Sequence, residues 1–296
     1  MARPFGRLAG TLWLPRFEDP NAVVLMHPGS GAAGRSNDGY FSAIQEHFLV
    51  RGCGVVSLDK RGVGQSDGSW WLAGIEDQAS DVAACAGTIR EIVGSEPKLG
   101  LFGHSQGGWV VVEAAAGGVD ADFVISNSGP GVTPAAQERF ATETRMRAAG
   151  ISPRTIADML VSYDELVELA RRGTPVGTAR ERLETTAHDQ LQPGIWIDLA
   201  SDEKSWLMMT QLANYDPEPA LAAIEVPMLV IYGELDALVP VEASARAMRA
   251  CVPSEHLSLR ILAGADHRLQ TGDPRTLGDD YFESLDAFLA RAGRLR

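Results

Sequence analysis

A serine between two glycines, in the Gly-His-Ser-Gln-Gly segment at residues 103–107, constrains this chain more than any other feature. The apolar run before it, residues 98–102, predicts a short buried strand, and the run after it, residues 108–116, predicts a buried helix. A strand that turns directly into a helix leaves no room for side chains two residues before and after the serine, where the glycines stand. The turn therefore places the Ser105 hydroxyl at the end of a sheet, beside a helix N-terminus.

A serine hydroxyl is a weak nucleophile, so a catalytic role for Ser105 requires a base and an acid that orients the base. On this kind of turn the chain order is serine, then aspartate or glutamate, then histidine. Two later apolar runs predict strands that are followed by Asp236 and His267. We therefore predict a triad of Ser105, Asp236 and His267. Glu234 competes with Asp236 for the role of the acid, and Asp236 and His267 each have the alternative of an ordinary loop residue.

The serine turn is one of several motifs that extend along most of the chain: residues 8–15, 23–31, 58–66, 103–107, 224–227, 233–236 and 264–267. Together they resemble the α/β-hydrolase superfamily, in particular its bacterial serine-esterase and serine-aminopeptidase-like members. The resemblance implies an α/β fold, in which helices cover both faces of a mostly parallel twisted sheet. It also implies a helical lid between strands 6 and 7 of the usual eight, with the first of the eight truncated or missing in this chain.

Acyl transfer needs hydrogen-bond donors that face the oxygen on which negative charge develops. One predicted donor is the backbone N–H of Gln106, the residue after the nucleophile. The resemblance places the second donor of this oxyanion hole in the loop after the strand that ends near His27. Here Pro28 stands where the family commonly has glycine, and proline has no N–H. The second donor is therefore predicted to be Gly29 or Ser30, with Ser30 preferred.

The same loop supports a rival interpretation. Residues 29–34 match Gly-x-Gly-x-x-Gly after a strand, and Asp59 ends the next strand, as in nicotinamide-dependent (NAD) oxidoreductases. That function requires a helix that begins at the glycines, so that its N-terminus meets a pyrophosphate. The helical pattern instead begins near Tyr40, which favours the hydrolase.

Composition limits the partners. Hydrophobic residues make up 45% of the 296 residues, enough for one α/β domain with an insertion, and the formal net charge is −13. An acidic surface repels nucleic acid and anionic membranes, so we expect neither as a partner and expect a small-molecule substrate. The first residues lack the pattern of a signal peptide, and no run approaches the ~18 apolar residues of a membrane span. We expect a cytoplasmic protein and leave open whether it forms a homodimer.

The cysteines indicate neither a disulfide framework nor a metal site. Cys53, Cys85 and Cys251 are odd in number and scattered along the chain. Neither His-Glu-x-x-His nor Cys-x-x-Cys occurs in the sequence. We therefore expect buried reduced thiols, no metal and no cofactor.

Alternation of strands and helices predicts the core of the fold. Strand-like runs lie near residues 7–14, 22–27, 54–59, 98–103, 122–127, 228–233 and 257–262. Helix-like runs lie near residues 40–50, 75–93, 106–117, 241–251 and 276–292. This order implies a mostly parallel sheet covered on both faces, with the first strand as an antiparallel edge arm. The turn Asp59-Lys60-Arg61-Gly62 after the third strand is predicted to be held by ion pairs and backbone contacts.

Residues 132–215 interrupt the alternation. They contain no strand-like run but do contain helical stretches near 134–149, 153–172, 176–191 and 202–214, three of which have a proline near their start. We therefore predict a core domain over residues 1–131 and 216–296 and a helical lid or cap over residues 132–215. The resembled family places its lid at this point.

A lid excludes water and shapes the substrate pocket. The candidates for its apolar lining are Trp196, Trp206, Met208 and Met209. Trp70 and Trp71, at the catalytic end of the sheet, are candidates for another wall of the substrate cleft. The alternative for the residues of the lid is ordinary packing onto the core, which is the usual role of aromatic and methionine residues at helical spacing.

Together these features predict a serine hydrolase that forms a covalent acyl-enzyme and cleaves a small-to-medium, neutral or apolar carboxylic ester. Ser105 would attack the carbonyl, His267 would carry the proton, and Asp236 would orient the imidazole. Peptidases, lactonases, thioesterases and acyltransferases use the same groups, so the sequence leaves these reactions open. A slowly turning over ligand-binding protein on the same scaffold is a further alternative.

Overall fold

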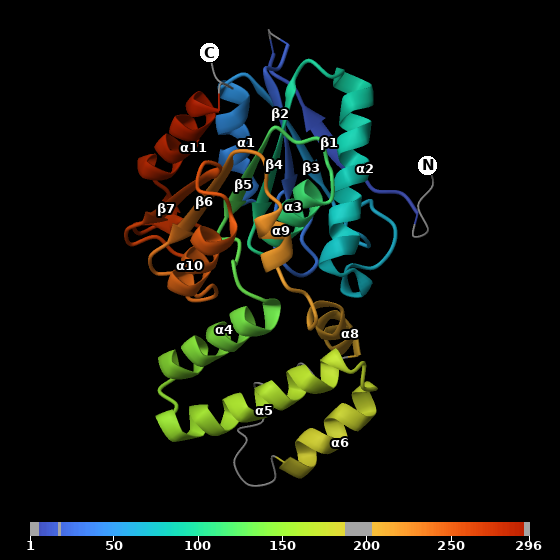
Figure 1. Cartoon of the computed structure of the whole chain (residues 1–296), viewed down its shortest axis with the longest axis vertical. Coiled ribbons are helices and arrows are strands. Elements are labelled where there is room, and N and C mark those ends of the chain that lie inside the picture. Colours follow the sequence, from blue (N-terminus) through green and yellow to red (C-terminus); the bar gives the residue numbers. More distant parts are fainter. Residues whose placement is uncertain (1–5, 17–18, 187–202, 293–296) are drawn as a thin grey trace.

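The computed structural model describes residues 6–16, 19–186 and 203–292 (Figure 1). A seven-stranded sheet with the order β1-β3-β2-β4-β5-β6-β7 forms its centre. The strands are β1 (Gly10–Trp13), β2 (Ala22–His27), β3 (Cys53–Leu58), β4 (Lys98–His104), β5 (Phe123–Asn127), β6 (Met228–Gly233) and β7 (Leu257–Leu262). Their positions agree with all seven predicted strands.

The sheet is parallel apart from its first strand. β1 pairs antiparallel with β3, with Gly10 opposite Leu58, as predicted for an edge arm. Strands β2, β3, β5 and β6 are buried at every position, because helices cover both faces of a parallel sheet. All parallel strands end at the same edge of the sheet, so the loops after β2, β4, β6 and β7 lie close together.

Helices form an apolar layer on each face. On one face α1 (Phe41–Val50) and α11 (Asp279–Arg291) pack against the sheet. The other face is covered by α2 (Ile75–Val93), α3 (Gln106–Ala116), α9 (Glu218–Ala222) and α10 (Val241–Cys251). The predicted helix at 276–292 begins late, because β9 (Thr276–Leu277) first pairs with β8 (Gln270–Thr271) in a small antiparallel hairpin. No described helix combines the length and the apolar character that crossing a bilayer requires.

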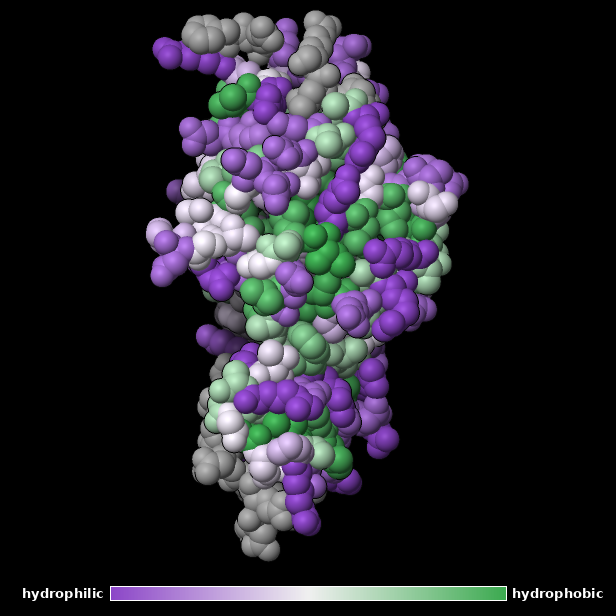
Figure 2. Space-filling view, turned by 90° about the vertical axis from the view of Figure 1, so that its left-hand side faces the viewer, coloured by the Kyte–Doolittle hydropathy of each residue, from purple (hydrophilic) through white to green (hydrophobic). Residues whose placement is uncertain are grey.

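A helical insertion separates β5 from β6. It contains α4 (Pro134–Ala148), α5 (Pro153–Arg171), α6 (Val176–Thr186) and α8 (Glu203–Leu212), which lie together below the sheet in Figure 1. Pro134 and Pro153 begin their helices, and the side chains of Thr133 and Ser152 cap them. The insertion has a hydrophobic core of its own, and Figure 2 shows it as the smaller, lower lobe. The end of the predicted helix 176–191 lies outside the described residues.

Candidate active site

Ser105 lies on the predicted turn between β4 and α3, which the structure confirms. Its backbone has φ 54° and ψ −121°, a strained conformation for a residue with a side chain. A Cβ on Gly103 would lie 2.0 Å from the carbonyl oxygen of Gly107, and a Cβ on Gly107 would lie 2.4 Å from that of His27. The two glycines are therefore required by close backbone contacts, which hold Ser105 at the end of the sheet.

His267 and Asp236 form a hydrogen-bonded pair. His267 Nδ1 lies 2.8 Å from Asp236 Oδ2, and the Asp236 side chain is fully buried. Asp236 Oδ1 accepts the backbone N–H groups of Leu238 and Val239, at 2.8 and 2.9 Å. Both carboxylate oxygens are therefore fixed, and the imidazole donates its Nδ1 proton to the carboxylate. In this tautomer Nε2 is the nitrogen that can accept a proton.

The loop after β6, which carries Asp236, packs closely against the loop after β7, which carries His267. A Cβ on Gly233 would lie 2.2 Å from the carbonyl oxygen of Asp266, so the end of β6 touches the loop after β7. Leu235 N–H also donates to the carbonyl of Ala265, at 2.8 Å. Glu234, the competitor of Asp236, instead accepts the N–H of Gly264 at 2.8 Å on an exposed turn. The geometry therefore favours Asp236 as the partner of His267.

His104, the residue before the serine, contacts the His267 loop. The two imidazole centroids are 5.1 Å apart, and His104 Nε2 lies 3.4 Å from the carbonyl oxygen of His267. Asn37 Nδ2 donates to His104 Nδ1 at 3.0 Å, so the His104 proton resides on Nε2 and points to His267. Burial, reinforced by the nearby His267, holds the pKa of His104 well below its usual value and keeps the ring neutral. The structure thus brings Ser105, Asp236 and His267 to one edge of the sheet.

The loop after β2 flanks the serine. A Cβ on Gly29 would lie 3.5 Å from the Cβ of Ser105. The N–H of Gly29 donates to Asn37 Oδ1 at 3.4 Å, so this donor already has a partner. Ser30 and Gln106 line the same cavity as Ser105. Of the two predicted candidates for the second oxyanion donor, Ser30 is therefore the one the geometry favours.

The dinucleotide-binding alternative finds no support in this loop. Residues 29–34 form bends and irregular loop, turns follow at residues 35–40, and α1 begins only at Phe41. The glycines therefore do not begin a helix whose N-terminus would meet a pyrophosphate.

A cavity of about 280 Å³ extends from Ser105 to the insertion. It is lined by Ser30, Ser105, Gln106, Trp109, Pro134, Ala135, Gln137, Glu138, Tyr163, Val167, Met208, Met209, Leu212 and Ala213. Met208 and Met209 thus occupy the predicted position. Half of the other twelve lining residues come from α4 and α5, and they could not be predicted because the sequence does not show which face of each helix meets the core.

The tryptophans proposed for the pocket lie elsewhere. Trp206 is buried in the core of the insertion, where its Nε1 donates to the carbonyl of Thr174 at 2.9 Å. Trp70 and Trp71 stand in the short 3-10 helix η1 (Trp70–Leu72), which packs against α8, and Lys204 Nζ lies 4.4 Å from the centre of the Trp71 ring. None of these three lines the cavity at Ser105, so packing describes them better than substrate contact. Trp196 lies outside the described residues.

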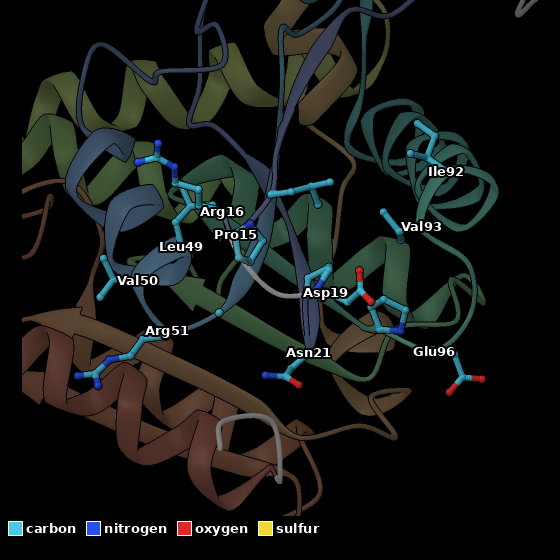
Figure 3. Close-up of a pocket in the computed structure, with 14 residues that line it drawn as sticks. Pro15, Arg16, Asp19, Asn21, Leu49, Val50, Arg51, Ile92, Val93 and Glu96 are labelled. Atoms are coloured by element: carbon cyan, nitrogen blue, oxygen red, sulfur yellow. The ribbon is translucent and has the colours of Figure 1, made fainter.

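A larger hollow, of about 1390 Å³, lies at the opposite end of the sheet. Figure 3 shows it between Asn21 before β2, Arg51 after α1 and Glu96 after α2. None of the triad candidates lines it. Its size therefore does not make it the catalytic site, since ligands of such sheets bind at the carboxyl ends of the strands.

Comparison with known proteins identifies the family of this chain. The model of the serine aminopeptidase S33 family matches residues 18–274. The chain belongs to this family. Over 270 residues it is 28% identical to a monoacylglycerol lipase of Mycolicibacterium smegmatis, covering 89% of this chain and 86% of the relative. Over 229 residues it is 28% identical to a pimeloyl-[acyl-carrier protein] methyl ester esterase of Vibrio campbellii, covering 74% and 78%.

Solved structures show the same fold. The S33-family chain superposes on the monoacylglycerol lipase of Paleococcus ferrophilus with a TM-score of 0.61 at 18% identity, over 97% of this chain and 99% of that chain. Est1E of Butyrivibrio proteoclasticus, solved with ferulic acid bound, gives a TM-score of 0.60 at 18% identity, over 97% and 95%. The predicted α/β-hydrolase fold is confirmed, and the chain is an enzyme of the serine hydrolase class.

Proposed function

We propose that this S33-family enzyme hydrolyses a carboxylic ester through an acyl-enzyme on Ser105. The observation that carries the proposal is the hydrogen bond between His267 and the buried Asp236, at the same edge of the sheet as Ser105 on its strained turn. His267 Nε2 takes the proton of Ser105 as its Oγ attacks the ester carbonyl. The C–O bond to the alcohol then breaks, and His267 returns the proton to the leaving oxygen. His267 then takes a proton from a water molecule that attacks the acyl carbonyl. The bond between this carbonyl and Ser105 Oγ breaks, His267 returns the proton to Ser105, and the acid leaves.

Two backbone donors stabilise the oxyanion in this proposal. They are the N–H groups of Gln106, at the start of α3, and of Ser30, in the loop that flanks Ser105. Gly29 is excluded because its N–H is bound to Asn37 Oδ1. Each donor of such a pair contributes about 10²–10³-fold to kcat, because it binds the charge that develops only in the transition state.

The cavity supports a neutral acyl group of modest size. Its volume, about 280 Å³, is at the small end of the ~300–1,000 Å³ range of ligand pockets. Trp109, Val167, Met208 and Met209 give it apolar walls, whereas Glu138 places a carboxylate on its insertion side. An acyl chain with an anionic end would meet that carboxylate, whose side chain is 38% exposed and pairs with Arg145 at 2.7 Å. In this proposal α4, α5 and α8 act as a lid, and a neutral ester such as a monoacylglycerol is the best model of the substrate.

A series of p-nitrophenyl esters with increasing acyl length tests the proposal. The wild-type enzyme should hydrolyse the short and medium esters, and Ser105→Ala should lower kcat by roughly 10⁴-fold or more. The exposed Ser42 on α1 provides the matched control, and Ser42→Ala should behave as wild type. A fluorophosphonate probe should label Ser105. Labelling at a different serine, or full activity of Ser105→Ala, would contradict the proposed nucleophile.

A further inference from the structure

Lys60 differs from the charged residues beside it. Asp59 pairs with Arg35, and Arg61 pairs with Asp81, as predicted for this turn. Lys60 is only 5% exposed, and within the described residues it forms hydrogen bonds to two neutral oxygens and no ion pair. Lysine is almost never buried without a partner of opposite charge. The fold therefore keeps an ammonium group in a place where it costs stability.

The two acceptors of Lys60 belong to the two segments that supply the proposed oxyanion donors, the loop with Ser30 and the start of α3 with Gln106. Its Nζ donates to the carbonyl oxygen of Gly29 at 3.0 Å and to Oε1 of Gln106 at 2.9 Å. The Gly29 carbonyl is in the same peptide group as the N–H of Ser30. In a trans peptide the C=O and N–H point in opposite directions. Because Lys60 binds the carbonyl on one side, the Ser30 N–H is turned to the other, where Ser30 meets the cavity of Ser105.

We propose that Lys60 is a positioning residue that holds the Gly29–Ser30 peptide and the Gln106 side chain so that both backbone N–H groups face the substrate oxygen. The proposal rests on the ester hydrolysis proposed above. A hydrogen bond from a charged donor is stronger than one between neutral groups. It also polarises the peptide that accepts it, so that the N–H of the same peptide becomes a better donor.

The surroundings of Lys60 support this role. Burial lowers the pKa of Lys60 from 10.5 to about 7, so the charged form is costly here. His27, which lines the same small void, does not compete as a cation, because burial and the nearby Lys60 lower its pKa to about 3. A methionine at position 60 has a similar length and avoids the cost of a buried charge. The presence of lysine rather than methionine at position 60 is therefore better explained by positioning of the oxyanion donors than by a gain in stability.

Lys60→Met is the decisive variant, with Lys98→Met as the matched control. Lys98 is half-exposed at the start of β4, at the end of the sheet away from Ser105. Because Lys60 acts through the donors, kcat of Lys60→Met should fall about 10–100-fold, less than for loss of a donor itself. We expect KM to change less than about threefold, as for an interaction made in the transition state. The loss of the donor to two buried oxygens opposes the relief of the buried charge, so the Tm should change by only a few degrees, and Lys98→Met should keep the wild-type kcat and KM.

A trifluoromethyl ketone with the preferred acyl chain separates positioning from general damage, because its tetrahedral adduct places a negative oxygen in the hole. Its affinity for Lys60→Met should fall by the same factor as kcat, with kcat expressed per serine labelled by fluorophosphonate. An unchanged kcat per labelled serine, or an unchanged inhibitor affinity, would overturn the proposal. An unlabelled and inactive wild-type enzyme would instead refute the proposed function.

Gln106→Met tests the same contact from its other side and keeps the backbone N–H of residue 106. It should lower kcat about threefold to tenfold, a smaller loss because the Gly29 contact remains. Combined with Lys60→Met it should cause little further loss, since both changes remove one shared interaction. Additive losses in the double variant, or full activity of Gln106→Met, would argue against the contact.

Discussion

The sharpest test of the proposed triad is Asp236→Asn, which changes one oxygen into an amide nitrogen. Asp236 Oδ1 accepts two backbone N–H groups, whereas Oδ2 accepts the Nδ1 proton of His267. An asparagine at this position will keep its oxygen on the two N–H donors and present its NH2 group to His267. An NH2 group can only donate, so the imidazole must carry its proton on Nε2. That nitrogen can then no longer accept the proton of Ser105.

The structure also shows why the asparagine should not escape by rotating its amide. Rotation would turn NH2 toward the N–H groups of Leu238 and Val239 and leave two buried donors without an acceptor. Each unsatisfied donor costs about 1–3 kcal/mol. The wrong tautomer should therefore dominate, and the loss in kcat for such a change is about 10⁴-fold, or roughly 5.5 kcal/mol in activation free energy.

The assay compares kcat on a short p-nitrophenyl ester for wild type, Asp236→Asn and Glu234→Gln. Glu234 is the matched control, because its carboxylate binds only an exposed turn at Gly264. A substitution of an exposed side chain usually changes the free energy of unfolding by less than about 0.5 kcal/mol. An effect of the same size, about 0.5 kcal/mol, on the activation free energy would change the rate less than threefold. Equal Tm values for wild type and Asp236→Asn would show that the fold is kept. A loss below tenfold for Asp236→Asn, or a larger loss for Glu234→Gln, would refute the assignment of Asp236.

Three further predictions concern stability and selectivity. The pKa of Lys60 is lowered from 10.5 to about 7, so between these pH values the unfolded chain binds a proton that the folded chain does not, and the stability of wild type should rise with pH there. In thermal melts from pH 7 to 10, the Tm of wild type should therefore rise relative to that of Lys60→Met. Trp206→Ala should cost about 3–5 kcal/mol and lower the Tm by several degrees, with the order of preferred acyl lengths unchanged in the ester series. Met209→Ala removes part of a cavity wall, so kcat/KM should shift toward longer acyl chains by about 1–3 kcal/mol while fluorophosphonate labelling is kept. An unchanged ester profile for Met209→Ala, or a changed one for Trp206→Ala, would contradict the assigned cavity lining.

The turn at Ser105 and the pairing of Asp236 with His267 could be predicted because they depend on local rules, whereas their catalytic roles stay a prediction. Two glycines are needed wherever a strand turns directly into a helix, so the motif at residues 103–107 indicates both the turn and the exposure of its serine. Parallel strands place their carboxyl ends at one edge, so a carboxylate after β6 and a histidine after β7 must lie near that serine. These inferences require only the strand order along the chain, which apolar runs predict well.

Most of the cavity lining could not be predicted, because it depends on packing between distant segments, and the preference for Ser30 over Gly29 as oxyanion donor stays a prediction. Trp206 and Met209 are three residues apart on α8, yet Trp206 is buried in the core of the insertion, whereas Met209 only packs against that core and also lines the cavity. The position of α5 decides between them, and no local pattern indicates it. The choice between Gly29 and Ser30 likewise depends on the Asn37 side chain, which occupies the N–H of Gly29.

In the proposed function, the division between sheet and insertion separates reaction from selectivity. Ser105, Asp236, His267 and Lys60 are fixed by backbone contacts and hydrogen bonds within the core domain. The insertion supplies mainly apolar walls of the cavity, together with Glu138. Arg145 Nη2 donates to Oε1 of Glu138 at 2.7 Å. Changes in α4, α5 or α8 can therefore alter the preferred acyl group without moving the reacting atoms. If Glu138 excludes anionic acyl chains as proposed, Glu138→Gln should raise kcat/KM for a dicarboxylic monoester and leave a neutral ester of equal length nearly unchanged.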